Sequence, residues 1–254
     1  MRLGVALPIN APSGGPAAGS DYAQGAELME RIGFSSLWVF DAIGRGFMLP
    51  DPLMALTAAA TVTTRVELGV GVLQVPLRNV VDTAYRVLTL HHLAQGRLLF
   101  GVGAGSTRAD FDAFGVPYEE RFDRFAAQLP VLRELLATGR HGDTDLTPWP
   151  SALGGPPVFL AGWRGPSVRR AATEADGWIA SAANTDDDTL TDALKRFRDA
   201  GGRRAVITNI RVGADVAPAV DRLRRLRDIG FDDGVALVMR PTEERLTTVL
   251  ERAA

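Results

Sequence analysis

The feature of this sequence that most restricts its fold is a regular alternation of short apolar runs with segments of helical periodicity. The apolar runs are rich in Val, Ile and Leu, as strands buried on both faces of a parallel sheet should be. Strands that alternate with helices predict a parallel sheet covered by helices. The runs number eight: Leu3–Leu7, Ser36–Phe40, Val66–Leu73, Arg97–Val102, Pro157–Ala161, Gly177–Ala180, Ala205–Val212 and Gly234–Met239.

The segments between these runs carry helix boundary signals. Residues that cap helix N-termini stand before most of them: Ser20-Asp21, Asp51 followed by Pro52, Asn79, Thr185–Asp188, Asp215 and Thr242. Glycines that can close a helix follow others: Gly33, Gly96, Gly139, Gly201 and Gly230. Eight strands and their helices within 254 residues predict an α/β fold, a single (β/α)8 TIM barrel whose one domain spans residues 1–254.

Composition narrows the classes of function. The formal charge is −2 and basic residues are spread among acidic ones instead of clustering, so we expect no nucleic-acid partner. The chain has no cysteine, which excludes disulfides and fits a reducing compartment, so we expect a cytoplasmic protein. The apolar run within residues 1–8 is too short for a signal peptide or a membrane span, and we expect no membrane partner.

Two chemistries lack the residues that they need. Of three histidines, His91 and His92 are adjacent on one predicted helix and face different ways, and His141 lies far along the chain, so we expect no metal site. Without a cysteine or a Gly-x-Ser-x-Gly elbow, a hydrolase that uses a nucleophile is not favoured. The arginine-rich segment Asp221–Asp228 is typical of a solvated helix on the outside of a barrel.

In a barrel of this class the loops after the strands build the active site. The longest irregular stretch after a strand is Ala104–Pro117, and a second, Arg140–Gly155, precedes the fifth strand. Gly101–Ser106 is similar to a dinucleotide fingerprint, but no helix begins promptly and the strand is the fourth rather than the first. We therefore expect these glycines to allow a planar ligand close to the backbone, although a merely tight turn would also use them.

Other strand ends offer further candidates. Gly71 lies near the functional end of the third strand, and Asp41 closes the second, where it could contact a ligand, move a proton or cap a loop. After the fifth strand, Ala161–Ser167 brings glycine N–H groups to the start of a helix, as in phosphate sites. Trp163 could stack on a ring or pack at the surface, whereas Trp178 favours a core position and Ser181 a ligand contact.

Several motifs together resemble the luciferase-like family of flavin- or deazaflavin-dependent oxidoreductases, and especially its branch that depends on coenzyme F420. They are Gly33–Asp41 (GFSSLWVFD), Asp51–Leu53 (DPL), Leu68–Leu73 (LGVGVL), Gln95–Gly103 (QGRLLFGVG), Phe114–Arg121 (FGVPYEER), Val168–Ala172 (VRRAA) and Ala175–Trp178 (ADGW). The similarity is strong over residues 1–181 and weaker beyond.

The resemblance implies a barrel that holds coenzyme F420, or alternatively FMN, across the strand ends, with a non-prolyl cis peptide at Gly71-Val72. The implied cofactor-binding residues are Asp41, Gly71, Val72, Gly103, Ala104, Gly105, Ser106, Ala161, Gly162, Trp163, Gly165 and Ser181. The ring would lie against the first seven, and the phosphate near Ala161–Gly165. The family also implies a possible homodimer.

Two positions depart from the family. Many relatives carry histidine after the carboxylate of the second strand, where this chain has Ala42, and some sugar-phosphate dehydrogenases carry glutamate where it has Ser106. The resemblance implies hydride transfer between coenzyme F420 and a small organic substrate. Because the usual acid–base residue is missing, we take Asp41 and Ser106 as catalytic candidates and consider Asp41 or Asp110 for proton transfer. An FMN-dependent monooxygenase and a cofactor-binding protein without turnover are the alternatives.

Overall fold

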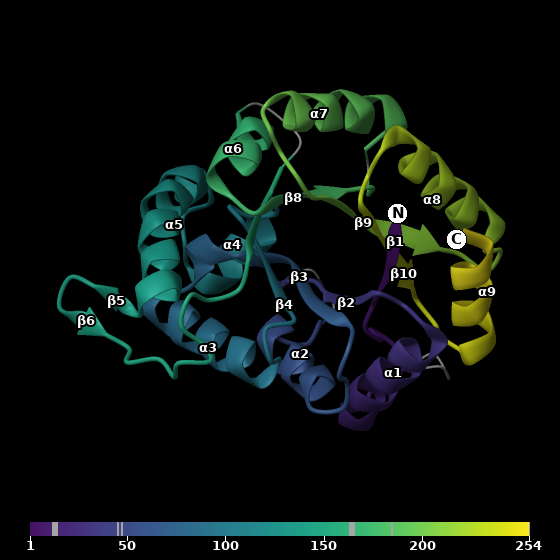
Figure 1. Cartoon of the computed structure of the whole chain (residues 1–254), viewed down its shortest axis with the longest axis horizontal. Helices are drawn as coiled ribbons and strands as arrows, with labels where there is room; N and C mark the ends of the chain where they lie inside the picture. The colour runs from purple at the N-terminus through teal and green to yellow at the C-terminus, as the bar shows by residue number, and fades with distance from the viewer. Residues whose placement is uncertain (12–14, 45, 47, 163–165, 184, 254) are drawn as a thin grey trace.

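The computed structural model describes residues 1–11, 15–44, 46, 48–162, 166–183 and 185–253. Eight parallel strands form a closed barrel, because β1 pairs with both β2 and β10 (Figure 1). The barrel strands are β1 (Arg2–Ala6), β2 (Ser36–Val39), β3 (Glu67–Gln74), β4 (Leu98–Gly103), β7 (Val158–Ala161), β8 (Gly177–Ser181), β9 (Ala205–Val212) and β10 (Asp233–Val238). The eight predicted strands and the predicted TIM barrel are confirmed.

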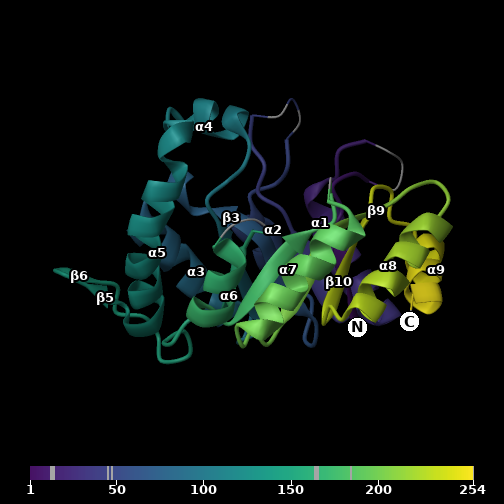
Figure 2. The same cartoon turned by 90° about the horizontal axis from the view of Figure 1, so that it is seen from above.

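Helices surround the barrel on its outside (Figure 1), except for α4, which lies in the loop after β4 above the end of α5 (Figure 2). They are α1 (Gly19–Ile32), α2 (Pro52–Ala60), α3 (Val80–Leu93), α4 (Arg108–Phe114), α5 (Arg121–Thr138), α6 (Ser167–Glu174), α7 (Asp187–Asp199), α8 (Ala217–Ile229) and α9 (Glu243–Ala253), with single 3₁₀ turns η1 (Val75–Leu77) and η2 (Tyr118–Glu120). Five residues of the predicted helix starts accept an N–H group of the helix that they precede, namely Asp51, Asn79, Asp186, Asp215 and Thr242. In the described part of the chain, no helix is both long and apolar enough to cross a bilayer.

Two stretches that we expected to be irregular contain regular structure. Helix α4 lies within Ala104–Pro117, where the short motif Arg108–Phe114 gave little periodicity. The stretch Arg140–Gly155 begins with a hairpin of β5 (Arg140–His141) and β6 (Thr144–Asp145), which projects from the barrel (Figures 1 and 2). The two paired residues per strand are too few to leave an alternating pattern in the sequence.

The arginine-rich part of α8 is only partly solvated. Arg222 turns toward the barrel, where its guanidinium donates to the carbonyl oxygens of Ala182 at 2.9 Å and Thr185 at 2.6 Å. It also bonds Asp187 at 3.3 Å, as does Arg225 at 3.0 Å. The helix lies on the outside of the barrel as expected, and Arg222 in addition holds the loop that follows β8.

Apolar side chains fill the barrel interior at mid-height. The inward cluster, which we call the central layer, comprises Trp38, Leu99, Phe159, Ile179, Val206 and Val235, with Val72 packed against it. A larger apolar cluster lies between the strands and the helices, and this outer cluster includes most of the remaining buried residues. The barrel is thus a packed core rather than a channel, as side-chain layers in this fold require.

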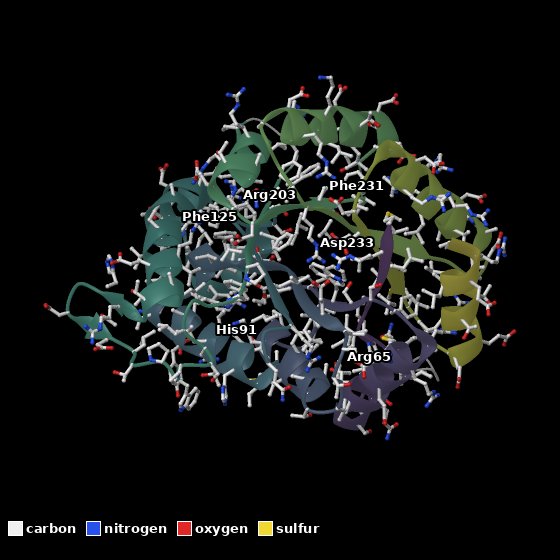
Figure 3. The ribbon with its side chains drawn as sticks, viewed as in Figure 1. Arg65, His91, Phe125, Arg203, Phe231 and Asp233 are labelled. Carbon is white, nitrogen blue, oxygen red and sulfur yellow. The ribbon has the colours of Figure 1, made fainter. Side chains whose placement is uncertain are left out.

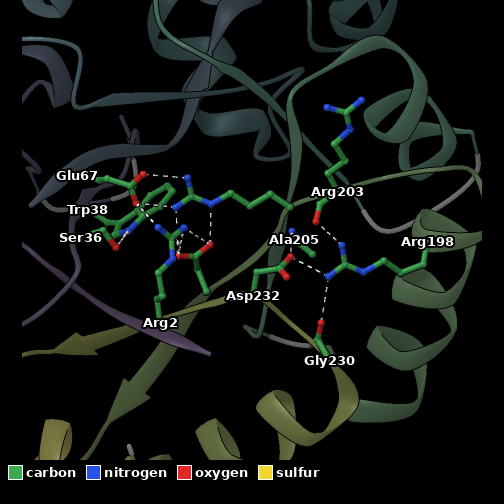
Figure 4. Close-up of polar contacts among 11 residues, drawn as sticks. Arg2, Ser36, Trp38, Glu67, Arg198, Arg203, Ala205, Gly230 and Asp232 are labelled. Carbon is green, nitrogen blue, oxygen red and sulfur yellow. Dashed lines mark hydrogen bonds and ion pairs between the residues drawn. The ribbon is translucent and has the colours of Figure 1, made fainter.

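The N-terminal end of the barrel is closed by ion pairs. Arg204 bonds Glu67 at 2.6 Å and Asp233 at 2.8 Å, and Arg2 reaches both carboxylates (Figure 4). Asp233 is fully buried within the ring of strands (Figure 3). Burial alone would lower the pKa of Arg204, but its hydrogen bonds to Glu67 and Asp233 hold that pKa above the ordinary value. This end is therefore structural, and a ligand site belongs to the opposite end.

Candidate active site

The C-terminal ends of the barrel strands, which we call the mouth, carry small inward residues directly above the bulky central layer. A Cβ atom placed on Gly103 would lie 3.0 Å from Val72 Cγ2 and 3.5 Å from Ala161 Cβ. One placed on Gly71 would lie 3.5 Å from Thr208 Cγ2, a residue of β9. The structure therefore brings Gly71, Val72, Gly103 and Ala161 side by side at the mouth, and we call these four residues the floor.

The peptide bond between Gly71 and Val72 is cis, as the family resemblance implied. A Cβ on Gly71 would also approach Trp38 Cε3 at 3.3 Å, so Gly71 lies on top of the indole. Gly101 differs, because a Cβ there would overlap the Val70 carbonyl and the Ile179 side chain. Gly101 thus serves packing inside the barrel, whereas Gly71 and Gly103 face the mouth.

The carboxylate of Asp41 is buried at the end of β2 and fully engaged. Arg78 forms a bidentate ion pair with it, at 2.7 Å to Oδ2 and 2.9 Å to Oδ1. The backbone N–H of Gln74 donates to Oδ2 at 2.9 Å. The Asp41 side chain is 1% exposed, so these three donors hold the carboxylate in place beneath the surface. The geometry suits a group that fixes the end of β3.

Gln74 connects this ion pair to the loop after β4. Its side-chain Nε2 donates to the Asp41 carbonyl at 3.2 Å and to Asp110 Oδ2 at 2.8 Å. Both partners are acceptors, so the orientation of the amide is determined. Asp110 is fully buried, and its Oδ1 accepts from the Ile43 N–H at 3.3 Å. One side chain thus joins the ends of β2 and β3 to α4.

The loop between β4 and α4 contains Ala104, Gly105 and Ser106. Gly105 has φ +82°, and a Cβ there would lie 2.6 Å from Gln74 Oε1, so a larger residue would be strained and crowded. Ser106 is exposed, its carbonyl accepts from the Tyr118 hydroxyl at 3.0 Å, and its own hydroxyl makes no hydrogen bond with the described residues. Ala104 is half-buried beside it.

The predicted phosphate side lies at the end of β7. Gly162 has φ +139°, and a Cβ there would lie 2.5 Å from Ser167 Oγ at the start of α6. The Gly162 carbonyl accepts from the indole N–H of Trp178. Trp178 is itself fully buried against Phe197, so the expected core position of this residue is confirmed. The predicted contacts Trp163 and Gly165 lie outside the described residues.

Ser181 lies at the end of β8 in a small polar cluster. Its Oγ accepts from Asn209 Nδ2 at 3.1 Å, and the same amide donates to Thr208 Oγ1 at 3.2 Å. Sequence reasoning missed Thr208 and Asn209. Asn209 has φ +62°, and an asparagine inside an apolar strand was a usable signal, because Asn is rare in strands and favours this conformation.

Sequence reasoning also missed Arg78 and Gln74. Both lie at or just after the end of the third strand, within a short stretch that ends at the helix cap Asn79. The Gln74 side chain is buried, since only 3% of the residue is exposed. A buried polar residue at the end of a barrel strand was the available signal, but its partners Asp41 and Asp110 lie 33 and 36 positions away.

Metal binding receives no support in the part of the chain that the structure describes. Among those residues, no three His, Cys, Asp or Glu side chains gather into a ligand set. His91 is buried in α3, and desolvation lowers its pKa below the ordinary value. His92 faces elsewhere and bonds Ser151 Oγ at 2.6 Å.

The closed barrel of eight parallel strands places the chain in the class of TIM-barrel proteins, a fold whose ligand sites lie at the C-terminal ends of the strands. The sequence profile of the luciferase-like monooxygenases matches residues 1–227. The chain belongs to the luciferase-like monooxygenase family, an oxidoreductase family, which confirms the resemblance drawn from its motifs.

Individual relatives extend over most of the chain. An uncharacterized protein of Mycobacterium tuberculosis is 30% identical over 259 residues, which cover 88% of each chain. An F420-dependent secondary alcohol dehydrogenase, solved with an F420-acetone adduct, superposes with a TM-score of 0.79 at 15% identity, covering 100% of this chain and 98% of that one. The FMN complex of the oxygenating constituent of 3,6-diketocamphane monooxygenase from Pseudomonas putida has a TM-score of 0.69 at 17% identity, covering 88% and 70%.

Proposed function

We propose that this protein is an oxidoreductase that transfers a hydride between coenzyme F420 and a small organic substrate, with FMN as the alternative cofactor. The observation that carries the proposal is the floor of small residues above the bulky central layer. In this proposal a flat ring lies against Gly71, Gly103 and Ala161, which have little or no side chain, and the central layer with Trp38 and Phe159 fills the barrel below it. Membership of an oxidoreductase family supports the same chemistry.

The residues at the mouth fit such a group. Gly71 and Val72 of β3 with Gly103, Ala104 and Gly105 would contact the ring. Ala161 and Gly162 would receive the phosphate beside the N-terminus of α6, where backbone N–H groups and the helix dipole favour an anion. The proposed contacts also include Trp163 and Gly165, and Ser181 would line the side next to β8. A bound flavin or deazaflavin supplies the hydride chemistry itself.

Within this proposal Asp41 is a positioning residue. Its carboxylate is engaged by Arg78 and the Gln74 backbone, so it holds the end of β3, and with it Val72, in register below the ring. Ser106 is the proposed proton carrier, because its hydroxyl is exposed on the loop that follows β4. Asp110 is a less suitable carrier, because it is fully buried and bonded to Gln74.

The proposal extends to the remaining expectations. We propose that residues 1–254 act as one domain, because the barrel elements run from Arg2 to Ala253. We also propose a cytoplasmic protein that takes a small-molecule substrate and forms a homodimer, on the grounds of its composition and its family.

Cofactor titration tests the proposal. Purified protein is titrated with coenzyme F420 and with FMN, and cofactor fluorescence is followed. We expect saturable binding of one of them, and at least a tenfold weaker affinity for Gly103→Val, whose side chain would project among Val72 and Ala161. Gly19→Val is the matched control, because nothing lies within 4 Å of a Cβ at Gly19. Unchanged binding by folded Gly103→Val, or no binding by the natural chain, contradicts the site.

Oxygen consumption separates the two enzyme chemistries. An FMN-dependent monooxygenase consumes oxygen with reduced FMN, because the reduced flavin reacts with oxygen inside a pocket that excludes water. A deazaflavin enzyme oxidises its reduced coenzyme only when a substrate is present. Free reduced FMN also reacts with oxygen, so the control is the same mixture without protein. Oxygen uptake that yields an oxygenated substrate only when the protein is present therefore overturns the preference for coenzyme F420.

Ala42 favours a second candidate function, a cofactor-binding protein without turnover. Ala42 is buried next to Asp41 and offers no ionisable group, whereas many relatives carry histidine there. Under this alternative, the natural chain binds cofactor without turnover. An Ala42→His variant that gains activity absent from the natural chain would support it, and measurable turnover by the natural chain would exclude it.

A further inference from the structure

Strand β9 contains one residue more than its neighbour β10 over the same length. Ile207 lies opposite Gly234, and Ile210 lies opposite Ala236, so three steps along β9 correspond to two along β10. Asn209, with φ +62°, stands within this interval. The irregularity is a β-bulge, a feature that is rare between parallel strands and that re-aims side chains near active sites.

Hydrogen bonds hold the bulge in place. The Asn209 amide donates to Ser181 Oγ and Thr208 Oγ1, and Thr208 Oγ1 donates to the Ala180 carbonyl at 3.0 Å. Thr208 also faces the floor, because its methyl group lies 3.5 Å from a Cβ placed on Gly71. The bulge is therefore attached to β8 on one side and forms part of the mouth.

The bulge reverses which residues of β9 face inward. Before it, Val206 belongs to the central layer and Thr208 faces the mouth. Regular alternation would then turn Ile210 inward and Arg211 outward. Instead, Ile210 and Val212 both lie in the outer apolar cluster, as do their partners on β10. Arg211, between them, is consequently turned to the inner side.

Arg211 stands at the rim of the mouth. Strand β8 ends at Ser181, which pairs with Thr208, whereas β9 continues past the bulge at Asn209 as far as Val212. The Arg211 side chain is exposed and forms no ion pair or hydrogen bond with the described residues. An inward arginine at the rim, placed there by a bulge, is available to bind a ligand in the mouth.

We propose that Arg211 binds a carboxylate or phosphate group of the substrate, and that the substrate is therefore a small anion. The proposal rests on the proposed function, since it assigns a substrate class to the same site. A guanidinium suits this task, because its planar set of N–H donors matches the two oxygens of a carboxylate or phosphate. Asn209 acts as the positioning residue, since the bulge determines the direction of Arg211.

Isothermal titration calorimetry tests the proposal with inorganic phosphate, with succinate, and with succinamide as the neutral counterpart of succinate. Each titration is made twice, once with protein without cofactor and once with protein loaded with the cofactor that binds. In the loaded protein the phosphate side near α6 is already filled. We expect succinate to bind at least tenfold more tightly than succinamide. Arg211→Gln should remove this preference, and Arg133→Gln, an exposed arginine on α5, should retain it.

A second measurement separates a substrate anion from the cofactor's own phosphate. The affinities of Arg211→Gln are compared for FMN and riboflavin, or for coenzyme F420 and its phosphate-free deazaflavin if that coenzyme is the one that binds, and we expect both to stay within about twofold of the natural chain. A loss for FMN alone would assign Arg211 to the cofactor and overturn the proposal. Three other results would also overturn it. They are equal binding of succinate and succinamide, no binding of phosphate or succinate, and a preference for succinate that survives Arg211→Gln. Absence of cofactor binding by the natural chain would instead count against the proposed function.

Discussion

Replacing Arg78 by methionine tests whether the buried ion pair with Asp41 supports the site. Asp41 loses two of its three N–H donors in this variant and keeps the backbone N–H of Gln74. The two side chains are 16% and 1% exposed, so water cannot readily replace the missing guanidinium. Removing one partner of a buried ion pair lowers the free energy of unfolding by about 3–5 kcal/mol. Because Asp41 keeps the N–H of Gln74, we expect a loss at the lower end of this range, about 3 kcal/mol.

The assay is urea unfolding followed by circular dichroism. With a slope of about 3 kcal/mol per molar urea, the loss lowers the unfolding midpoint by about 1 M. Arg86→Met is the matched control, because the Arg86–Asp82 pair is half-exposed on α3 and should contribute less than about 1 kcal/mol. The double variant Asp41→Asn/Arg78→Met should lose less than the sum of the two single losses, because no buried charge remains unpaired.

Two results would refute this reasoning. A midpoint for Arg78→Met that matches that of Arg86→Met would show that Asp41 does not depend on its partner. Additive losses in the double variant would show that the two side chains act independently. We also expect Arg78→Met to weaken cofactor binding, because Asp41 holds the Gln74 backbone beside the floor.

Three further expectations follow from other contacts. Trp178→Phe removes the donor to the Gly162 carbonyl and reduces the volume of a fully buried side chain, so it should weaken FMN binding about tenfold in a fluorescence titration and also lower the urea midpoint. Burial lowers the pKa of His91, so below about pH 6.5 the unfolded chain takes up a proton that the folded chain does not. The free energy of unfolding should therefore fall as the pH drops below about 6.5. Urea titrations at several pH values should show this dependence for the natural chain and not for His91→Leu. Arg204→Met leaves Asp233 buried without its main partner and should lower the unfolding free energy by about 3 kcal/mol or more, whereas a change below about 1 kcal/mol would contradict the role of the ion pairs at the N-terminal end.

The strands were predictable because each is a contiguous run of apolar residues. Ala205–Val212 was predicted with both ends correct, and the others shifted by about one residue, since hydrogen bonding to neighbours decides where a strand ends. Gly71 and Gly103 were also identified as site residues from the local sequence. A glycine weakens a buried strand unless a bulge or a closely approaching ligand requires it.

The network beneath the floor was not predictable in the same way. Asp41 was a candidate for catalysis, yet the partners that engage its carboxylate come from β3 and the turn after it. Nothing in the local sequence around Asp41 distinguishes a carboxylate that contacts a ligand from one that is paired with Arg78. The pairing depends on the closure of the barrel, which brings the two strand ends side by side.

The sequence by itself determined the order of strands and helices, the barrel that they form and the end of it where we propose a ligand site, because these follow from local periodicity and from the parallel direction of every strand. Only the tertiary structure decided which polar side chains meet and which way they face. The bulge at Asn209 is the clearest case, since one extra residue in β9 turns Arg211 from the outer side to the inner side. Side-chain direction in a strand depends on its register with the neighbouring strand, and that register exists only once the sheet has formed.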